Sequence, residues 1–341
     1  MSYPSATINP AHVTRDAQAK FNEVFDRKRA VANPIRDLFF QMGTIERNWD
    51  NYITWGSLDK VGKILAPDGR KFVSFDSYAR KITVQKYGAA IALDEDHFDD
   101  AGYMPGWQEA FRAKVGEIAV DLEDLWIDFL FDALTGGTAF LPGAVKSPDG
   151  ATSTVFDATG HFGGSVINDY DPATATSFAT SSLLADHDGL VNLITTNTDD
   201  KGRELAEFGG VSYTYIVPTD RVRAYAQALN APIIGLVPTT ATATTAAVAG
   251  VTNMVDVSGG IKVMGWSKLN ALSPEKVFVV ADFGNNARVN NGAPFEIVTR
   301  KNPKVRYGAP DVDHDQHRWA FDARYALRLV RPHNIYRIDK A

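Results

Sequence analysis

The densest group of side chains that could bind a metal ion lies in DVDHDQH, residues 311–317. Carboxylates and imidazoles are ligands for divalent metals. The candidate ligands are Asp311, Asp313, His314, Asp315 and His317. The run lacks the glycine and the distal glutamate of a calcium-binding loop, and it follows a Gly-Ala-Pro turn, where polar loops are common. We therefore expect a solvated loop, with a metal-dependent enzyme that uses residues 311–317 as an alternative.

A second acidic group, DEDHFDDAG at residues 94–102, surrounds His97 with carboxylates. Carboxylates near a helix N-terminus cap free N–H groups and favour the helix dipole, so we expect this group to begin a helix. We interpret His97 as an ordinary polar residue. His161 lies in the glycine-rich FDATGHFGGS and has no evident base or nucleophile partner in the sequence.

The usual catalytic motifs are absent from the sequence. It has no GxxxxGK[ST] phosphate loop, no GxGxxG after a strand, no GxSxG and no HExxH. It has no cysteine, which excludes disulfides, thiolate nucleophiles and cysteine-based zinc sites. We therefore predict neither a cofactor nor an enzyme.

The composition is that of a globular protein made in soluble form. The 341 residues are 45% hydrophobic and 22% charged. The net charge of −6 argues against a protein that grips nucleic acid over its whole surface. There is no signal peptide and no apolar run of about 20 residues, so we expect no membrane partner.

The first 50 residues are predicted to form an arm that contains one helix. Phe21 and either Val24 or Phe25 have helical spacing. Residues 12–36 otherwise carry six basic and three acidic side chains, so we expect this helix to bury little against its own chain. A frayed terminal helix is the alternative interpretation.

Residues 56–88 are predicted to form a long β-ribbon. APDG at 66–69 is a good turn sequence, and Ile82 and Val84 alternate with polar residues as in a strand with one solvated face. The ribbon is mainly basic, and its basic residues include Lys60, Lys63, Arg70, Lys71, Arg80 and Lys81.

A long helix is predicted from about Met104 to Leu134, ended by Gly136-Gly137. Its apolar stripe consists of Trp107, Phe111, Val115, Ile118, Leu122, Leu125, Phe129 and Ala133. Another face carries a row of carboxylates, namely Glu117, Asp121, Asp124, Asp128 and Asp132. Like charges at i,i+4 weaken a helix by about 0.2–0.5 kcal/mol per pair, so the row predicts basic partners from elsewhere.

The rest of the sequence mixes helices with strands. Helices are predicted within 176–196 and from 221, and strands at 211–218, 276–283, 294–299 and near the C-terminus. Because strands are inserted between helices without regular βαβ alternation, the predicted class is α+β.

This order of parts resembles a phage major capsid protein of the Hong Kong 97-type fold, and the local pattern is most similar to the Mu-like major head subunit (gpT) family. The matching segments are NYITWGSLDKVGKI, KITVQKYGAAIALDEDHFDDAGYMPGW, VFDATGHF and YTYIVPTDRVRAYAQALNA. Together they follow nearly the whole chain.

The resemblance implies a domain plan for the chain. The plan has an N-terminal arm at 1–50, an extended β-ribbon loop at 51–90, a peripheral domain with a spine helix at 91–175, an axial domain at 176–300, and C-terminal strands at 301–341 that return to the peripheral domain. In this fold the arm and loop reach onto adjacent subunits. The basic ribbon and the acidic row, in the residues given above, are therefore the predicted inter-subunit contacts.

The resemblance also implies the function and the partners. Many copies would self-assemble into pentamers and hexamers of an icosahedral shell that encloses double-stranded DNA without sequence-specific binding. The protein would be made in the host cytoplasm and end in the virion. Scaffolding and portal proteins are expected to be separate chains, and decoration proteins are further candidates. An encapsulin-type compartment and a phage tail or adaptor protein remain alternatives.

Some members of this fold cross-link a loop lysine to an asparagine with the help of a glutamate. Here the candidate amines are Lys60, Lys63, Lys71 and Lys81, and Asn334 is the candidate asparagine. No glutamate follows Glu296, so we expect a non-covalent shell.

Overall fold

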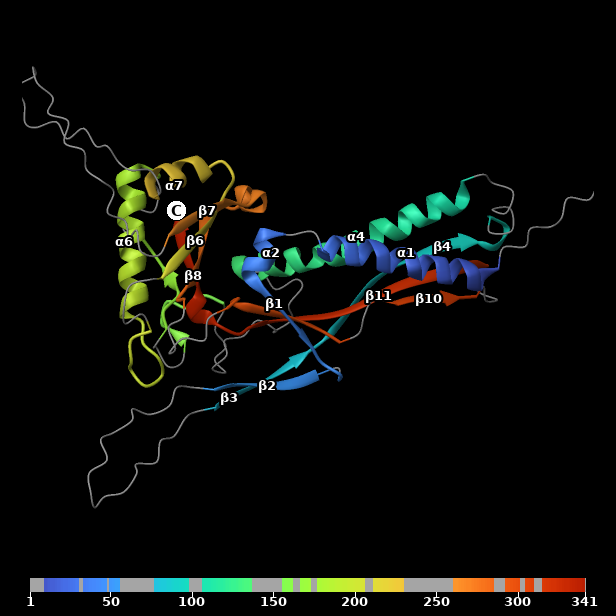
Figure 1. Cartoon of the computed structure of the whole chain (residues 1–341), viewed down its shortest axis with the longest axis horizontal. Helices are drawn as coiled ribbons and strands as arrows, with labels where there is room; N and C mark the ends of the chain where they lie inside the picture. The colour runs from blue at the N-terminus through green and yellow to red at the C-terminus, as the bar shows by residue number, and fades with distance from the viewer. Residues whose placement is uncertain are drawn as a thin grey trace, which may run out of the picture. The chain divides into compact units, whose positions relative to one another are not determined.

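The chain forms two compact units, unit 1 and unit 2 (Figure 1). Unit 1 comprises Met1–Asn51, Lys81–Ala144 and Glu296–Arg328, and unit 2 comprises Tyr52–Arg80, Val145–Phe295 and Leu329–Ala341. The computed structural model describes residues 9–30, 33–47, 49–55, 77–97, 106–136, 155–161, 166–172, 177–205, 211–229, 260–284, 292–300, 304–309 and 315–340.

Unit 1 packs helices on one face of a five-stranded sheet. The helices are α1 (Pro10–Ala30), α2 (Pro34–Phe39) and α4 (Trp107–Thr135). The strands are β1 (Phe40–Thr44), β4 (Gln85–Asp94), β9 (Phe295–Thr299), β10 (Lys304–Gly308) and β11 (Gln316–Leu329). The sheet has the order β1-β9-β11-β10, and β4 also pairs with β11. A separate two-stranded sheet joins β2 (Trp49–Trp55) to β3 (Ser77–Thr83).

The strand β11 lies at the centre of unit 1 and separates a buried face from an open one. Along it Trp319, Phe321, Ala323 and Tyr325 are buried, while the alternating Ala320, Asp322 and Arg324 are partly exposed. Phe21 of α1 stacks on Phe321 at 5.5 Å between ring centroids, and Phe111 of α4 meets Trp319 edge-on at 5.1 Å. Burying each such ring stabilises the fold by about 1.5–3 kcal/mol.

The helix α1 is part of this core, so the expectation that it buries little against its own chain is wrong. The buried side chains are Val13, Ala17, Phe21, Val24 and Phe25. They recur at intervals of three or four residues and form a stripe longer than the one predicted from the sequence. The stripe includes the small Ala17, which carries little hydrophobic signal of its own.

The helix α4 confirms the predicted long helix. It ends at Gly136, whose φ of 79° lies in the left-handed region and whose N–H donates to the Asp132 carbonyl. Ile118 and Leu125, which were assigned to the apolar stripe, are only partly buried, and their neighbours Ala119 and Trp126 are buried instead.

The start of α4 differs from the prediction. Glu95 to His97 are helical, but α4 begins only at Trp107, with Gly106 in the left-handed region as its N-cap. The acidic group at 94–102 therefore does not begin the helix that carries the acidic row.

Unit 2 contains a second five-stranded sheet, with the order β5-β12-β8-β6-β7. Its strands are β5 (Asp169–Tyr170), β6 (Ser212–Val217), β7 (Ile261–Gly265), β8 (Glu275–Asp282) and β12 (Ile335–Lys340). The helices are α6 (Thr180–Thr196), α7 (Val222–Leu229) and the short 3-10 helices η1 (Ser267–Ala271) and η2 (Pro332–Asn334). The predicted helices and strands between 176 and 299 are confirmed, and so is the α+β class.

The core of unit 2 lies between one face of this sheet and the helices α6 and α7. Tyr215, Val279 and Tyr336 contribute from neighbouring strands, and Leu190 and Tyr225 contribute from the helices. At the end of β12, Lys340 is fully buried; its ammonium pairs with Asp186 of α6 and donates to the Ser177 carbonyl at 3.0 Å. Within the described part of the chain, no helix is both long enough and apolar enough to cross a bilayer.

Candidate functional site

The predicted basic ribbon is described only at its base. Lys60, Lys63, Arg70 and Lys71 and the APDG turn lie outside the described residues, while Arg80 and Lys81 lie on β3, which pairs with β2. At the end of β3 and just after it, Ile82 and Val84 are buried and Thr83 is exposed. The predicted alternation of this strand is confirmed.

The acidic row on α4 changes in exposure along the helix. Glu117 and Asp121 are exposed, whereas Asp124, Asp128 and Asp132 are partly buried. Glu117 accepts a hydrogen bond from Lys114 Nζ at 2.8 Å, one turn away on the same helix. The part of the row nearest the start of α4 is therefore the part that faces solvent.

One partner of the row comes from the same chain. Lys28 Nζ of α1 lies 3.1 Å from Asp124 Oδ1, and both side chains are about half exposed. The sequence offered one signal for this pair, because Lys28 follows Val24 by four residues and so lies beside the buried stripe. The resemblance implied an arm that reaches onto adjacent subunits. A pair between a basic residue of the arm and the acidic row of its own chain was not predicted from the sequence.

A second ion pair of opposite polarity connects the same two helices. Arg112 Nη2 of α4 lies 3.0 Å from Asp16 Oδ2 of α1. Both pairs join residues separated by 96 positions in sequence. The helices α1 and α4 therefore run in the same direction, and the same offset between paired residues holds at both contacts. Near them Arg36 Nη1 lies 3.5 Å from Oε1 of the buried Glu123.

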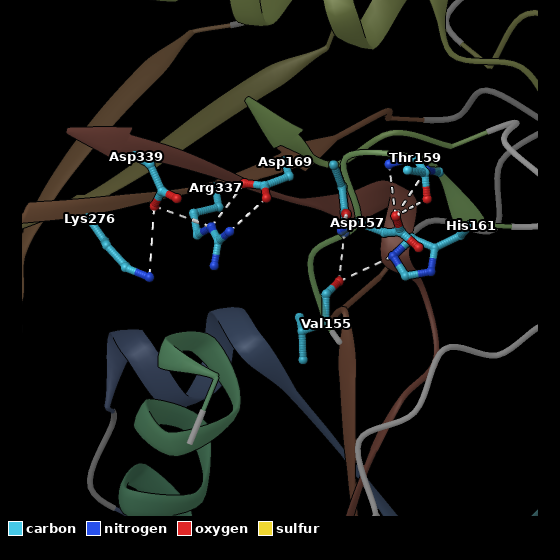
Figure 2. Close-up of polar contacts among 10 residues, drawn as sticks. Val155, Asp157, Thr159, His161, Asp169, Lys276, Arg337 and Asp339 are labelled. Atoms are coloured by element: carbon cyan, nitrogen blue, oxygen red, sulfur yellow. Dashed lines mark hydrogen bonds and ion pairs between the residues drawn. The ribbon is translucent and has the colours of Figure 1, made fainter. Parts of the chain in front are cut away.

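Residues 155–161, which make up all but the last residue of the segment VFDATGHF that contributed to the resemblance, form an ordered turn in unit 2 (Figure 2). Asp157 Oδ1 accepts hydrogen bonds from Thr159 N at 2.8 Å, Thr159 Oγ1 at 2.6 Å and Gly160 N at 3.2 Å. Burial alone would raise the pKa of Asp157, but these hydrogen bonds together with the nearby His161 lower it. His161 is fully buried, and its Nε2 lies 3.2 Å from the Val155 carbonyl oxygen.

Next to this turn, Figure 2 shows a chain of ion pairs that joins three strands of unit 2. Arg337 of β12 donates from Nε and Nη2 to Asp169 of β5 at 2.9 and 2.6 Å. Asp339 lies 3.3 Å from Arg337 and 3.9 Å from Lys276 of β8. Burial raises the pKa of Asp339, and these two cations oppose that rise. The geometry is that of a network holding β5, β12 and β8 together.

Of the possible metal ligands, Asp311, Asp313 and His314 lie outside the described residues. Asp315 is exposed, and its carbonyl accepts a hydrogen bond from Glu95 N at 2.9 Å. His317 is buried against Trp319, and its Nδ1 lies 2.6 Å from Tyr307 Oη. Over the residues that the structure describes, no three His, Asp or Glu side chains gather as a metal site would require.

The candidate asparagine of a covalent cross-link and the last glutamate of the sequence are both held within the fold. Of the candidate amines, Lys60, Lys63 and Lys71 lie outside the described residues. Asn334 is buried, and its Nδ2 donates to the Gly292 carbonyl at 2.7 Å. Glu296 is also buried and accepts from Arg328 Nε at 2.9 Å and from Gln41 Nε2 at 3.2 Å. Neither side chain can react without breaking these contacts.

No family model and no curated protein sequence matches the chain. Among solved structures, one from Mycobacterium phage Patience matches with a TM-score of 0.50 and 10% identity, covering 98% of this chain and 89% of that one. The capsid of an empty GTA particle matches with a TM-score of 0.45 and 13% identity, covering 100% and 95%. A virus-like particle from Pyrococcus furiosus matches with a TM-score of 0.42 and 13% identity, covering 96% and 99%.

The likeness to the Patience structure extends over nearly all of both chains, and it concerns the fold alone because the identity is low. The chain therefore has an α+β fold of the Hong Kong 97 capsid type, as the sequence resemblance implied.

Proposed function

We propose that this chain is a major capsid subunit, similar in local sequence pattern to the Mu-like head subunit (gpT) family, that self-assembles into the pentamers and hexamers of an icosahedral shell enclosing phage DNA. The observation that carries the proposal is the shared fold over 98% of the chain. The shell fold covers nearly the whole chain, so the proposal does not include a separate domain with another activity.

The domain plan is proposed on the same basis. The helix α4 on the sheet of unit 1 corresponds to a spine helix in a peripheral domain, and unit 2 with α6 and α7 corresponds to an axial domain. Of the C-terminal strands expected at 301–341, β10 and β11 lie in unit 1, whereas β12 lies in the sheet of unit 2 and so differs from the plan. The strands β2 and β3 lead into the extended loop at 51–90. The arm at 1–50 includes α1, which is packed in unit 1.

The proposed inter-subunit contact joins the basic ribbon of one copy to the acidic row of the next. Glu117 and Asp121 are the best candidates within the row because they are exposed, whereas Asp124 pairs with Lys28 of its own chain. An exposed ion pair contributes only about 0–1 kcal/mol. Many copies of such a contact in a closed shell add together.

The remaining partners are proposed from charge and chemistry. The net charge of −6 disfavours tight binding to the enclosed DNA, so we propose packaging without sequence-specific contacts. Scaffolding and portal functions are assigned to separate proteins. A non-covalent shell is favoured because Asn334 and Glu296 are buried in contacts of their own.

Negative-stain electron microscopy of the protein, expressed alone and with its neighbouring genes, tests the proposal. Closed polyhedral shells, pentamers or hexamers would support it, whereas a monomer at all salt concentrations in both cases would overturn it. Rings or tubes would instead indicate a tail or adaptor protein. In purified shells, an enclosed enzyme in place of DNA would indicate an encapsulin-type compartment.

A pair of charge-reversed variants tests the proposed contact within that experiment. Glu117→Lys combined with Asp121→Lys should raise the protein concentration needed for assembly about tenfold. The matched control is Asp188→Lys combined with Asp220→Lys, which reverses two exposed carboxylates in unit 2. An equal effect of the two variants on assembly would show that the acidic row is not part of the contact.

A further inference from the structure

The sheet of unit 1 has a second face that its own helices do not cover. Figure 1 shows α1 and α4 along one side of β4, β11 and β10. Side chains on that side of β11, such as Trp319 and Phe321, are buried, whereas Arg318 and Ala320 on the other side are partly exposed. On the flanking strands, the residues in register with Ala320 are Ala90 and Arg306, and both are exposed.

This open face has a floor of small residues. The small residues are Gly88, Ala90 and Ala92 of β4, Ala320 of β11 and Gly308 of β10. Gly88 is required by packing, because a Cβ there would lie 2.3 Å from the Phe321 carbonyl oxygen. A floor without long side chains lets another polypeptide approach the sheet closely.

The charged side chains around the floor are mainly basic. They are Lys86 of β4, Lys304 and Arg306 of β10, Arg318 and Arg324 of β11, with two acids, Asp322 of β11 and Asp94 at the end of β4. Asp322 is shared between Lys86 Nζ at 2.9 Å and Arg306 Nε at 3.2 Å, so one carboxylate offsets two cations. Lys304 and Arg318 form no ion pair with any described residue, which leaves an excess of positive charge on the face.

The complementary charge lies at the far end of the same sheet. Asp94 ends β4 on the open face, and Glu95 and Asp96 follow it; all three are exposed. Lys86 and Asp94 are eight residues apart on one strand, which corresponds to about 27 Å. Each copy therefore carries an acidic tip, defined as Asp94, Glu95 and Asp96, at the opposite end of the open face from Lys86 and Lys304, and these two ends cannot reach each other within one chain. Arg318, in register with Ala92, lies between them.

We infer that the open basic face of unit 1 binds the acidic tip of a second copy of this chain. Two different surfaces on one chain give a head-to-tail contact, which closes into a ring when the rotation between copies is suitable. The inference rests on the proposed self-assembly, and adds to it a contact distinct from that between the ribbon and α4. A second copy is the favoured occupant because the chain itself carries the complementary charge in an exposed position.

Charge reversal on each side, and on both sides together, tests the contact. The face variant is Lys304→Glu with Arg318→Glu, which spares the cations bound to Asp322. The tip variant is Glu95→Lys with Asp96→Lys. Sedimentation velocity at low salt should show that each raises the concentration needed for assembly about tenfold, and that the combined variant returns to within about threefold of the original protein.

The matched control reverses two exposed cations of unit 2, Arg223→Glu with Lys262→Glu, and should assemble normally. If the face variant also assembles normally, or if the combination is no better than the face variant alone, the inference is overturned while self-assembly stands. If the unmodified protein never assembles, the proposed function and this inference fall together. Loss of co-purifying nucleic acid in the face variant, with no effect of the tip variant, would assign the face to a polyanion and overturn the inference.

A measurement on the unmodified protein covers the case in which a variant fails to fold. A zero-length carbodiimide cross-link should join Lys304 to Glu95 or Asp96 in assembled particles and not in monomers. Within one chain Lys304 is in register with Gly88, which lies six residues before Asp94, so the two ends are about 20 Å apart. Such a link can form only between copies, and its absence from assembled particles would overturn the inference.

Discussion

The buried ion pair between Lys340 and Asp186 offers the most direct test of how unit 2 is held together. The side chains are 0% and 5% exposed, and the ammonium also lies 5.4 Å from the Phe178 ring centre. The test replaces Lys340 by methionine, which keeps the aliphatic length and removes the charge. The carboxylate of Asp186 then remains in the interior without its cation.

The expected cost follows from this burial. Removing one partner of a buried ion pair typically lowers the free energy of unfolding by about 3–5 kcal/mol, because the other charge is left uncompensated. Replacing both partners, as Lys340→Met with Asp186→Leu, should cost less than about 1 kcal/mol. The matched control is Lys276→Met: its pair with Asp339 is longer, at 3.9 Å, and more exposed, so the expected loss is at most about 1 kcal/mol.

Urea denaturation of the unassembled subunit, followed by far-ultraviolet circular dichroism, measures these three variants together with the single variant Asp186→Leu, which completes a double-mutant cycle. Equal losses for Lys340→Met and Lys276→Met would refute the reasoning. So would a double variant whose loss equals the sum of the two single losses, because the two side chains would then not interact.

Three further predictions use the same denaturation assay. Phe21→Ala should lower the free energy of unfolding by about 3–5 kcal/mol, and Met42→Ala, at a side chain that is 59% exposed, by less than about 1 kcal/mol; similar losses would mean that α1 is not part of the core. Lys28→Asp should lower the free energy of unfolding by at most about 1 kcal/mol, and adding Asp124→Lys should bring it back to the original value. No recovery in the double variant would mean that the pair does not contribute to stability. The pKa of Asp157 is lowered from its ordinary value of 3.8, so its charged form stabilises the fold above that value, and this stabilisation is lost as the pH falls through the lower pKa of the folded protein. Asp157→Ala should therefore lower the free energy of unfolding by about 1 kcal/mol at pH 7 and by less in acid. A loss that does not change with pH would contradict this.

The elements of this fold that depend on local pattern were predictable from the sequence. The helix α4 was recognised because its apolar residues repeat over many turns, and β6 and β8 because they are short apolar runs. The burial of α1 was not predictable, since its stripe packs on Phe321 and its neighbours, which lie about 300 residues away in sequence. A weak local stripe is insufficient to show what distant strand will cover it.

The open face shows the same limit for a candidate site. The alternation of Arg318, Ala320 and Asp322 with buried aromatic residues is visible in the sequence, and it indicates a strand with one polar face. The basic character of the whole face depends on the pairing of β11 with β4 and β10, which brings Lys86 and Arg306 onto it. Single-sequence periodicity contains no information on that pairing. The contact between Lys28 and Asp124 was missed for the same reason.

The common offset of 96 residues in the two ion pairs between α1 and α4 has a consequence for insertions and deletions. Adding residues between Ala30 and Trp107, outside α2 and the paired strands, changes both sequence separations equally, so the docking of the two helices is unaffected by the length of the loops that join them. Deleting one residue between Asp16 and Lys28 instead turns half of α1 by about 100°, and only one of the two pairs can then form. The ribbon can thus vary in length among related chains, while α1 and α4 must keep their lengths in step.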